Sequence, residues 1–375
     1  MSGREPVRIR SVEAVSFRNH ERLVVTPGPG LTVLVGPNAV GKSNLLEAVT
    51  LAASAASFRQ FSWPDVVKEG QDRALVRVEA ERGSVGVAVS LEVESSGKKT
   101  FFVDGVRKRT VSDIAGRIPV VTFVPDDLQL AKGPAEARRN ALDALGSQLS
   151  GAYASLKSEY GRIVRQRTAA LKQEGEKKGT PEWDELLVRT GAAFFIHRAR
   201  LAARIDKEIV DLYRSLAGGE RLEVRIEPSW GGEGRAPHEW AGATKEVAEQ
   251  HMRQALEQIS ATERARGLTL IGPHRDDFGL LIEGLPARGF ASQGQQRSLA
   301  LAWKMAEAEV VGDVLGYSPV LLLDDVMSEL DEHRRAALQE FVASGPQSLI
   351  TTTNLAYFDE ERLKDAEIVR VDDVR

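Results

Sequence analysis

Between positions 36 and 43 the chain reads Gly36-Pro37-Asn38-Ala39-Val40-Gly41-Lys42-Ser43, after the apolar run 31–35 and before the helix-like segment 44–49. This GxxxxGKS pattern in a strand-to-helix setting is typical of a loop whose backbone N–H groups surround phosphates. The positive N-terminus of the following helix favours the same negative charge. We expect Lys42 to reach the β- and γ-phosphates and Ser43 to hold Mg²⁺. The pattern therefore predicts a nucleoside triphosphate site in an α/β fold; the alternative is a glycine turn before an ordinary helix.

Two carboxylates, Asp324 and Asp325, end a second apolar run far downstream, at positions 321–323. In phosphoryl chemistry, the first carboxylate of such a pair completes the Mg²⁺ shell and the second orients or deprotonates the attacking water. We assign these roles to Asp324 and Asp325, in that order. A solvated turn is the alternative. The long separation from Lys42 predicts a large insertion between the two halves of the site.

Two further segments have the composition of helix starts. Ser292 is followed three positions later by Gln295, which is a capping-box spacing, and a capping box explains both residues without any function. A phosphate-facing helix start needs the same chemistry, a small hydroxyl and a glycine, here Gly294. In the run 328–331, Asp331 can cap the helix that follows, and capping alone would explain it.

The composition restricts the class of protein. With 375 residues, 42% of them apolar and 28% charged, the chain is long enough for two or three globular domains. The absence of cysteine excludes disulfides and thiolate metal sites, and the six histidines have no metal-binding spacing. Mg²⁺ with ATP is the only metal predicted. No apolar run reaches the length of a membrane span and the start of the chain is polar, so we expect a cytoplasmic protein.

The formal net charge of −4 is unusual for a protein that binds DNA, because affinity for the phosphate backbone comes from clustered Lys and Arg. Local basic groups do occur. For each group taken alone, the alternative is a solvent-exposed face with no DNA contact, which is the more common case. The candidates are Lys98-Lys99, Arg107-Lys108-Arg109, Arg138-Arg139, the set Arg162, Arg165 and Arg167, and the set Arg198, Arg200 and Arg204.

Up to about residue 131 the pattern is mostly β with one long helix. Alternating polar and apolar residues predict strands over 7–15, 22–26, 75–79 and 85–94, and the segment 95–98 predicts a hairpin turn before a strand over 100–103. These strands suit an antiparallel β layer beside the nucleotide core.

From Pro134 the apolar residues step by three and four, which predicts one helix through Ile163. A charged break over 172–181 precedes a second long helix through Leu212, and the two helices are expected to pack as an antiparallel pair. His197 on the apolar stripe of the second helix is expected in the core or at its boundary. A strand over 222–226, a loop over 230–237 and a helix over 247–259 complete the insertion, and the chain then returns to β over 268–271.

Along the chain, the phosphate loop is followed by a long insertion, the string 292–295, the pair Asp324 and Asp325, and the run 328–331. This order of motifs resembles the RecF family of SMC-like ABC-type ATPases. Further strings shared with the family are Phe17-Arg18-Asn19, Ser57-Phe58-Arg59, Gly272-Pro273-His274-Arg275-Asp276-Asp277 and Thr351-Thr352-Thr353-Asn354. The resemblance implies an α/β fold, an ABC/SMC-type P-loop ATPase head with an antiparallel β layer and an inserted helical lobe. The expected parts are 1–132 (head with Walker A), 133–265 (lobe) and 266–375 (head with the signature motif and Walker B).

The resemblance also implies that two protomers face each other head to tail and share two ATP molecules. Lys42, Ser43 and Asp324 of one protomer would grip the nucleotide, and Ser292 and Gly294 of the other would bind its γ-phosphate. The family pattern further implies roles for loop residues 36–44, for Arg18 and Asn19 at the nucleotide, for Gln293 and Gln295 in the signature, and for Ser328 and Asp331 in the D-loop. Thr352 and Thr353 stand where many ABC heads have a histidine, and the resemblance assigns a catalytic role to Thr353. Arg59 is expected to contact phosphate or DNA, and a surface arginine is the alternative.

One departure from the wider ABC pattern predicts slow turnover, because Asp325 stands where most of these ATPases have glutamate. The Q-loop residue has no obvious counterpart in the run 123–128.

The implied function is a weak, DNA-stimulated ATPase and clamp that binds double-stranded DNA near single-strand/double-strand junctions. With RecO and RecR it would help to load RecA. The alternatives are an ABC transporter subunit, a related nuclease, and a scaffold that binds ATP without hydrolysing it.

Overall fold

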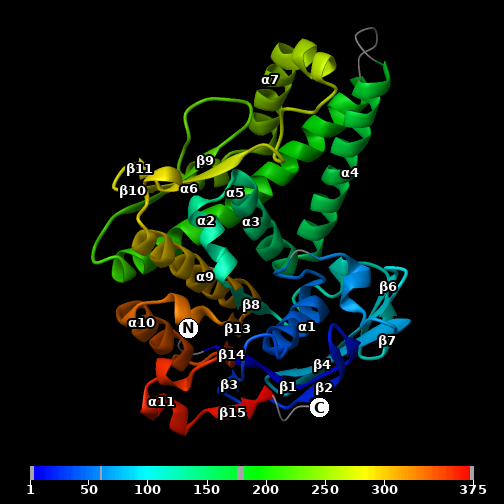
Figure 1. Cartoon of the computed structure of the whole chain (residues 1–375). Helices are drawn as coiled ribbons and strands as arrows, with labels where there is room; N and C mark the ends of the chain where they lie inside the picture. Colours follow the sequence, from blue (N-terminus) through cyan, green and yellow to red (C-terminus); the bar gives the residue numbers. More distant parts are fainter. Residues whose placement is uncertain (1–3, 60, 175–180, 372–375) are drawn as a thin grey trace. The chain divides into compact units, whose positions relative to one another are not determined.

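The computed structural model describes residues 4–59, 61–174 and 181–371 (Figure 1). Its contacts divide the chain into two compact units, Met1–Asp127 with Ala300–Arg375, and Leu128–Leu299. The sequence placed the end of the lobe at residue 265, whereas the second unit continues to Leu299. Strand pairing explains the difference, because β9 (Leu222–Glu227) pairs antiparallel with β10 (Asp277–Ile282) and so keeps the later segment in the lobe.

A five-stranded parallel sheet forms the centre of the first unit. Its order is β15 (Glu367–Arg370), β3 (Leu31–Val35), β14 (Ser348–Thr352), β13 (Val320–Asp324) and β8 (Val120–Phe123). Strands β3, β13 and β14 are almost entirely buried, as expected for parallel strands covered on both faces. Because all five run in the same direction, the carboxyl ends of β3, β13 and β14 meet at one edge.

A second, mainly antiparallel sheet confirms the expected β layer. Its order is β12 (Tyr317–Ser318), β1 (Glu5–Phe17), β4 (Arg73–Arg82), β5 (Val85–Glu94), β6 (Lys99–Val103) and β7 (Val106–Lys108), with β2 (His20–Val25) also paired to β1. Alternating burial along β4 and β5 matches the alternation in the sequence. Only the short β12 joins the described part of this sheet in parallel.

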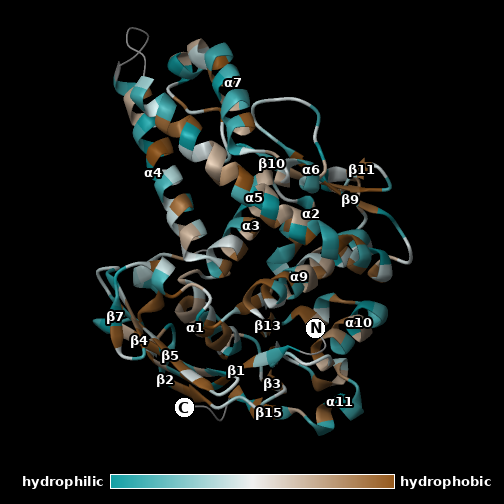
Figure 2. Ribbon diagram, turned by 180° about the vertical axis from the view of Figure 1, so that it is seen from behind, coloured by the Kyte–Doolittle hydropathy of each residue, from teal (hydrophilic) through white to brown (hydrophobic). Residues whose placement is uncertain are grey.

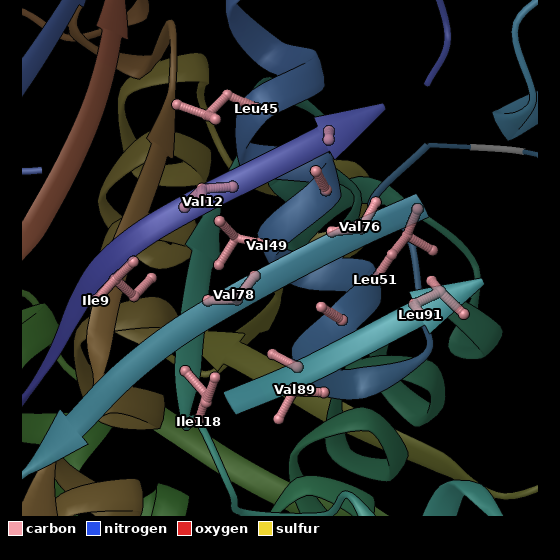
Figure 3. Close-up of a cluster of buried hydrophobic side chains, with 14 of the residues drawn as sticks. Ile9, Val12, Leu45, Val49, Leu51, Val76, Val78, Val89, Leu91 and Ile118 are labelled. Atoms are coloured by element: carbon pink, nitrogen blue, oxygen red, sulfur yellow. The ribbon is translucent and has the colours of Figure 1, made fainter. Parts of the chain in front are cut away.

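Helix α1 (Lys42–Ser54) contacts strands of both sheets. Its apolar side chains, including Leu45, Val49 and Leu51, pack against Val12, Val76, Val89 and their neighbours (Figure 3). Full burial of a Val or Leu side chain contributes about 1.5–3 kcal/mol. This core therefore fixes the helix whose N-terminus follows the glycine loop.

Further helices of the first unit follow the lobe in the sequence. Helix α9 (Gln293–Leu315) begins in the second unit and ends in the first. Helices α10 (Glu332–Ala343) and α11 (Glu360–Lys364) follow β13 and β14, respectively. The short 3-10 turns are η1 (Trp63–Val66), η2 (Val111–Asp113), η3 (Pro125–Leu128), η5 (Val326–Glu329) and η6 (Leu355–Tyr357).

The second unit is largely helical. Its helices are α2 (Gln129–Lys132), α3 (Ala135–Leu149), α4 (Gly151–Glu174), α5 (Pro181–Leu216), α6 (Pro237–Ala241), α7 (Lys245–Arg266) and α8 (Ala287–Phe290), beside the small sheet β11-β10-β9, in which β11 is Leu285–Pro286. Hydrophobic and hydrophilic colours alternate along α4 (Figure 2), as expected for an amphipathic helix. Helices α4 and α5 pack on each other. Part of the expected break between them, residues 175–180, lies outside the described residues.

Three local expectations for the lobe were wrong. The single helix expected from Pro134 to Ile163 is interrupted at Ser150, which has extended backbone angles and accepts a hydrogen bond on its hydroxyl from the N–H of Tyr153. The run 268–271 forms no strand, because the Leu270 N–H is bonded to the Glu263 carboxylate and the strand β10 starts only at Asp277. His197 is exposed, and the neighbouring Arg198 is buried in its place.

Across the described ranges, no helix has both the length and the apolar content that crossing a bilayer requires.

Candidate functional site

The glycine loop joins β3 to α1 at the carboxyl edge of the parallel sheet. Gly41 has φ +102°, a left-handed conformation, and an added Cβ would collide with the ring of His20, so glycine is required there. The first turn of α1 contains no acidic residue and its N-cap makes no side-chain hydrogen bond. The loop therefore leaves the backbone amides and the positive end of the helix available to an anion.

Lys42 is held over this loop. Its side chain is buried, and its Nζ donates hydrogen bonds to the carbonyl oxygens of Gly36 at 2.6 Å and Pro37 at 2.7 Å. These contacts fold the ammonium group back across the turn. Lys42 is thus positioned where the charge of a bound phosphate chain would be neutralised.

A cavity of about 910 Å³ opens beside the loop. Most of the expected nucleotide residues line it: Asn38, Ala39, residues 41–44, Arg18, Asn19 and Arg59. Gly36 and Pro37 contribute the carbonyl groups that Lys42 binds, and Val40 packs against the hydrophobic core. Residues from three separate segments, 18–19, 38–44 and 59, therefore meet at the phosphate loop.

The two expected carboxylates end β13 next to β14. The Thr351 hydroxyl donates to Asp324 Oδ1 at 2.8 Å and accepts from the backbone N–H of Asp325 at 2.9 Å. Thr351 and Asp325 also line the cavity. Thr351 was not assigned a role from the sequence, because only the pairing of β13 with β14 shows that it lies beside the carboxylates.

Asp325 combines three energetically unfavourable features, one in its backbone and two in its side chain. Its φ is 52°, its Oδ1 is buried with no hydrogen-bond partner among the described residues, and burial raises the pKa of its carboxyl group despite the nearby charge of Lys42. The charges of Asp324 and Glu329 raise that pKa further. Strain and desolvation of this kind collect at functional sites, and a carboxyl group with a raised pKa suits proton transfer.

We expect Thr351→Val to lower the stability of the protein by about 1–3 kcal/mol, because it removes the hydroxyl that serves both Asp324 and the Asp325 backbone. Binding of Mg²⁺-ATP should weaken as well, since Asp324 loses its orienting partner. Urea unfolding and ATP titration with and without Mg²⁺ measure the two effects. Thr100→Val on strand β6 is the matched control. Equal behaviour of the two variants would contradict a role for Thr351.

Mg²⁺ prefers oxygen ligands and binds proteins through one or two carboxylate or hydroxyl groups together with the phosphates of its substrate. The Ser43 hydroxyl at the cavity and the Asp324 carboxylate at the end of β13 are such donors. Across the described residues, no group of three or more His, Cys, Asp or Glu side chains could hold a metal without a substrate. The donor set therefore fits a cation that arrives with a triphosphate.

The expected signature residues lie in the second unit. The Ser292 N–H donates to Gln295 Oε1 at 2.8 Å and the Gln295 N–H donates to the Ser292 hydroxyl at 3.2 Å, so the capping box is present. Gln295 Nε2 also donates to both carboxylate oxygens of Glu220 at 3.1 Å. Ser292 and Gln293 are exposed and Gly294 is partly exposed. Capping fixes the helix start and leaves its outer surface accessible.

The expected D-loop follows β13. The Ser328 hydroxyl donates to the carbonyl oxygen of Asp325 at 2.8 Å, and Asp331 caps α10 by accepting from the Arg334 N–H at 2.9 Å. This backbone hydrogen bond lowers the pKa of Asp331. The capping explanation for Asp331 is therefore sufficient for its local structure.

Thr353, which was assigned a catalytic role, is exposed and is absent from the described lining of the cavity. Thr352 is buried, and its hydroxyl donates to the carbonyl oxygen of Asn354 at 3.0 Å. Only Thr351 of the three threonines reaches the cavity. The register of β14 thus favours Thr351 over Thr353 as the hydroxyl beside the carboxylates.

The string 272–277 lies inside the second unit. His274 Nδ1 is 2.7 Å from the Tyr160 hydroxyl, and its Nε2 is 3.1 Å from the carbonyl oxygen of Thr269. Burial lowers the pKa of His274 to about 4, so the ring is neutral near pH 7. These contacts give His274 a structural role in the lobe.

Three of the candidate DNA-binding arginines are buried in ion pairs of the lobe. Arg138 pairs with Asp277 at 2.8 Å, Arg167 with Glu263 at 2.6 Å and Arg198 with Asp143 at 2.9 Å. Burial removes these three from the candidates for a DNA contact. The exposed candidates include Lys98, Arg107, Arg109, Arg162, Arg165, Arg200 and Arg204.

Comparison with known proteins gives a consistent result. The family model RecF/RecN/SMC N terminal domain matches residues 8–371. The DNA replication and repair protein RecF of Synechococcus sp. (strain JA-2-3B'a(2-13)) is 39% identical over 369 residues, which cover 97% of this chain and 96% of that protein.

Solved structures agree with the expected fold. A structure of the recombination mediator protein RecF-ATP in the RecFOR pathway is similar with a TM-score of 0.87 and 28% identity, covering 96% of this chain and 95% of that one. A structure of the SmcHead bound to the C-winged helix domain of ScpA shares the fold with a TM-score of 0.51 at 15% identity, covering 93% and 90%. The expected ABC/SMC-type head is therefore confirmed. Since the family model spans nearly the whole chain and the RecF relative matches it from end to end, this chain belongs to the RecF family of DNA replication and repair proteins.

Proposed function

We propose that the protein is an ATP-switched DNA clamp. The observation that carries the proposal is the cavity at the glycine loop, where Lys42, Ser43 and the strained, desolvated Asp325 face the same space. Lys42 and Ser43 suit the binding of a triphosphate, and Asp325 suits the activation of water. The similar solved structure of RecF-ATP supports ATP as the nucleotide.

In this proposal, Lys42, Ser43 and residues 36–41 hold ATP, and Ser43 and Asp324 hold the Mg²⁺ that comes with it. When bound, Mg²⁺ neutralises charge on the phosphate oxygens. Asp325 accepts a proton from the attacking water, and hydrolysis is slow because the aspartate is one methylene shorter than the glutamate of other ABC ATPases. The exposed helix start at Ser292 and Gly294 binds the γ-phosphate of the partner protomer.

ATP would thus join two protomers around double-stranded DNA, and hydrolysis would release them. In this proposal the clamp acts near junctions of single- and double-stranded DNA, and RecO and RecR are its partners in loading RecA. The exposed arginines and lysines named above are the candidates for DNA contact.

We expect Ser292→Arg to prevent ATP-dependent dimerisation while the monomer still binds ATP. The arginine side chain would fill the surface that receives the partner's γ-phosphate, and the lost cap costs the helix only about 1 kcal/mol. Light scattering with ATP, ADP and no nucleotide measures the dimer, and titration of a fluorescent ATP derivative measures binding.

Ser96→Arg, in an exposed hairpin turn of the first unit, is the matched control and should dimerise like the unmodified protein. A Ser292→Arg protein that dimerises normally with ATP would overturn the shared site. Dimerisation that is the same with ATP, with ADP and without nucleotide would overturn the switch.

A further inference from the structure

Glu47 is a fully buried carboxylate on the helix that follows the phosphate loop. It lies on α1 three residues after Asn44 and four after Ser43, so the three side chains share one face of the helix. Its exposed fraction is 0%. A buried carboxylate is costly unless it is paired and hydrogen-bonded. Its neighbours in the sequence, Leu46 and Ala48, are also buried and gave no sign of a role for it.

Arg18 supplies the counter-charge. Its Nε donates to Glu47 Oε2 at 2.9 Å and its Nη2 donates to Oε1 at 2.5 Å, a bidentate pair. Its Nη1 donates to the carbonyl oxygen of Asp65 at 2.9 Å. All three nitrogens of this guanidinium therefore bind the protein. Arg18 itself has φ 54°, so the turn that carries it is held in an uncommon backbone conformation.

Arg59 is connected to the same carboxylate at two points. The Ser57 hydroxyl donates to Glu47 Oε1 at 2.7 Å and accepts from the backbone N–H of Arg59 at 3.0 Å. Arg59 Nη1 lies 3.4 Å from Glu47 Oε2 and donates to Asn44 Oδ1 at 2.8 Å. Among the described residues, both of these hydrogen-bond contacts use Nη1, which leaves Nε and Nη2 to face an anion. Arg59 lines the cavity and is exposed, whereas Glu47 is buried behind it and is not part of the lining.

We propose that Glu47 is a positioning residue that holds Arg59 at the phosphate cavity, with Arg18 as its fixed counter-charge. The inference rests on the proposed ATP site and adds a residue that acts on the nucleotide only through Arg59. Glu47 controls the backbone of Arg59 through Ser57 and its guanidinium directly. A shift of the carboxylate would therefore move the charge that faces the phosphates.

The test is a double-mutant cycle with Glu47→Gln and Arg59→Ala. Glutamine keeps the shape of the side chain but replaces one acceptor oxygen by an amide that points donors at Arg18 and Ser57. We expect each single variant to weaken the affinity for Mg²⁺-ATP about tenfold, as is typical for loss of a hydrogen bond to a charged group. The double variant should bind within about twofold of Arg59→Ala alone, because coupled residues are not additive.

Independent, multiplicative losses in the double variant would overturn the proposal, because a merely structural Glu47 would weaken binding whether or not Arg59 is present. The same conclusion would follow if Glu47→Gln bound ATP as tightly as the unmodified protein. Glu263→Gln is the matched control. Glu263 is equally buried and bonded to an arginine, but it belongs to the lobe, and its substitution should leave the ATP affinity of the folded protein unchanged.

Ser57→Ala is the second variant if Glu47→Gln does not fold. It removes only the hydroxyl that joins Glu47 to the Arg59 backbone, and we expect about threefold weaker ATP binding that disappears in the Arg59→Ala background. A loss that persists in that background would overturn the inference. If the unmodified protein itself bound no ATP, the proposed function would fail before the cycle was measured, so the two failures are distinguishable.

Discussion

Replacing Lys42 by methionine is expected to weaken ATP binding by about 100-fold or more. Loss of one partner of a buried charge pair costs about 2–5 kcal/mol, and each 1.4 kcal/mol is a factor of ten in affinity. Lys42 is the buried cation of the loop, and its hydrogen bonds to Gly36 and Pro37 already hold it across the phosphate position. Methionine has a similar length and no charge.

The folded state of Lys42→Met should survive, since methionine fills the space of the lysine side chain and the folded protein no longer bears the cost of a buried charge. Thermal unfolding with and without Mg²⁺-ATP separates folding from binding. A ligand at 100 times its Kd stabilises a protein by about 2.7 kcal/mol, so the unmodified protein should show a clear rise in Tm and the variant none.

Lys98→Met is the control for Lys42→Met. Lys98 is exposed and, among the described residues, forms an ion pair with Glu94 on the same hairpin, so its loss should leave the ATP-dependent rise in Tm intact. If Lys42→Met retained that rise, the glycine loop would not be the nucleotide site, and the proposed dimer would lose its basis.

The parts of the site that could be predicted from the sequence are those fixed by local patterns. The glycine loop, its flanking strand and helix, and the pair Asp324 and Asp325 are each contained in a few consecutive residues, and the structure brings them to one edge of the parallel sheet. The alternation along β4 and β5 predicted the antiparallel layer for the same reason.

The parts that could not be predicted depend on contacts between distant segments. Thr351 reaches the carboxylates through the register of β14 on β13, whereas the family pattern indicated Thr353, two residues later. Glu47 binds Arg18 and Ser57, which come from two other loops. Within the lobe, the pairing of β9 with β10 moved the boundary from 265 to 299, because a pairing partner cannot be read from the composition of either strand.

The helix break at Ser150 had a local signal that the apolar stepping concealed. A serine followed by Gly151 can end one helix and cap the next, and the Ser150 hydroxyl does accept from the Tyr153 N–H at 3.3 Å. Leu149 and Tyr153 keep a spacing of four across the break, so the periodicity alone predicted a continuous helix. Capping residues therefore deserve equal weight with periodicity in long helical segments.

Replacing Asp325 by asparagine is expected to lower the rate of ATP hydrolysis by about 10²–10⁴, the usual contribution of a general base. Asparagine keeps the shape of the side chain but cannot accept a proton. ATP binding should persist, because Lys42 and the loop amides are unchanged. The variant should then accumulate as the ATP-bound dimer, which single-turnover hydrolysis and light scattering would measure on the same sample.

The same substitution should stabilise the protein without nucleotide. Burial raises the pKa of Asp325 above its usual 3.8, so the folded state holds the proton more tightly than the unfolded state. The ionised carboxylate therefore opposes folding at pH values above the raised pKa, and stability rises as the pH falls through that pKa toward 3.8. Asparagine removes this charge and also tolerates a positive φ better than most residues.

The rate of hydrolysis should change with pH in the opposite direction to the stability of the folded protein. The unmodified protein should lose activity as the pH falls through the raised pKa, at a higher pH than an ordinary aspartate would cause, because the protonated carboxyl cannot act as a base. Asp359→Asn, at an exposed helix start of the same unit, is the control and should change neither rate nor stability appreciably. A variant of Asp325 that is more stable but equally active would show that the desolvated carboxylate is not the base. A variant that is inactive and more stable would show that the protein gives up folding stability at this residue in return for catalysis.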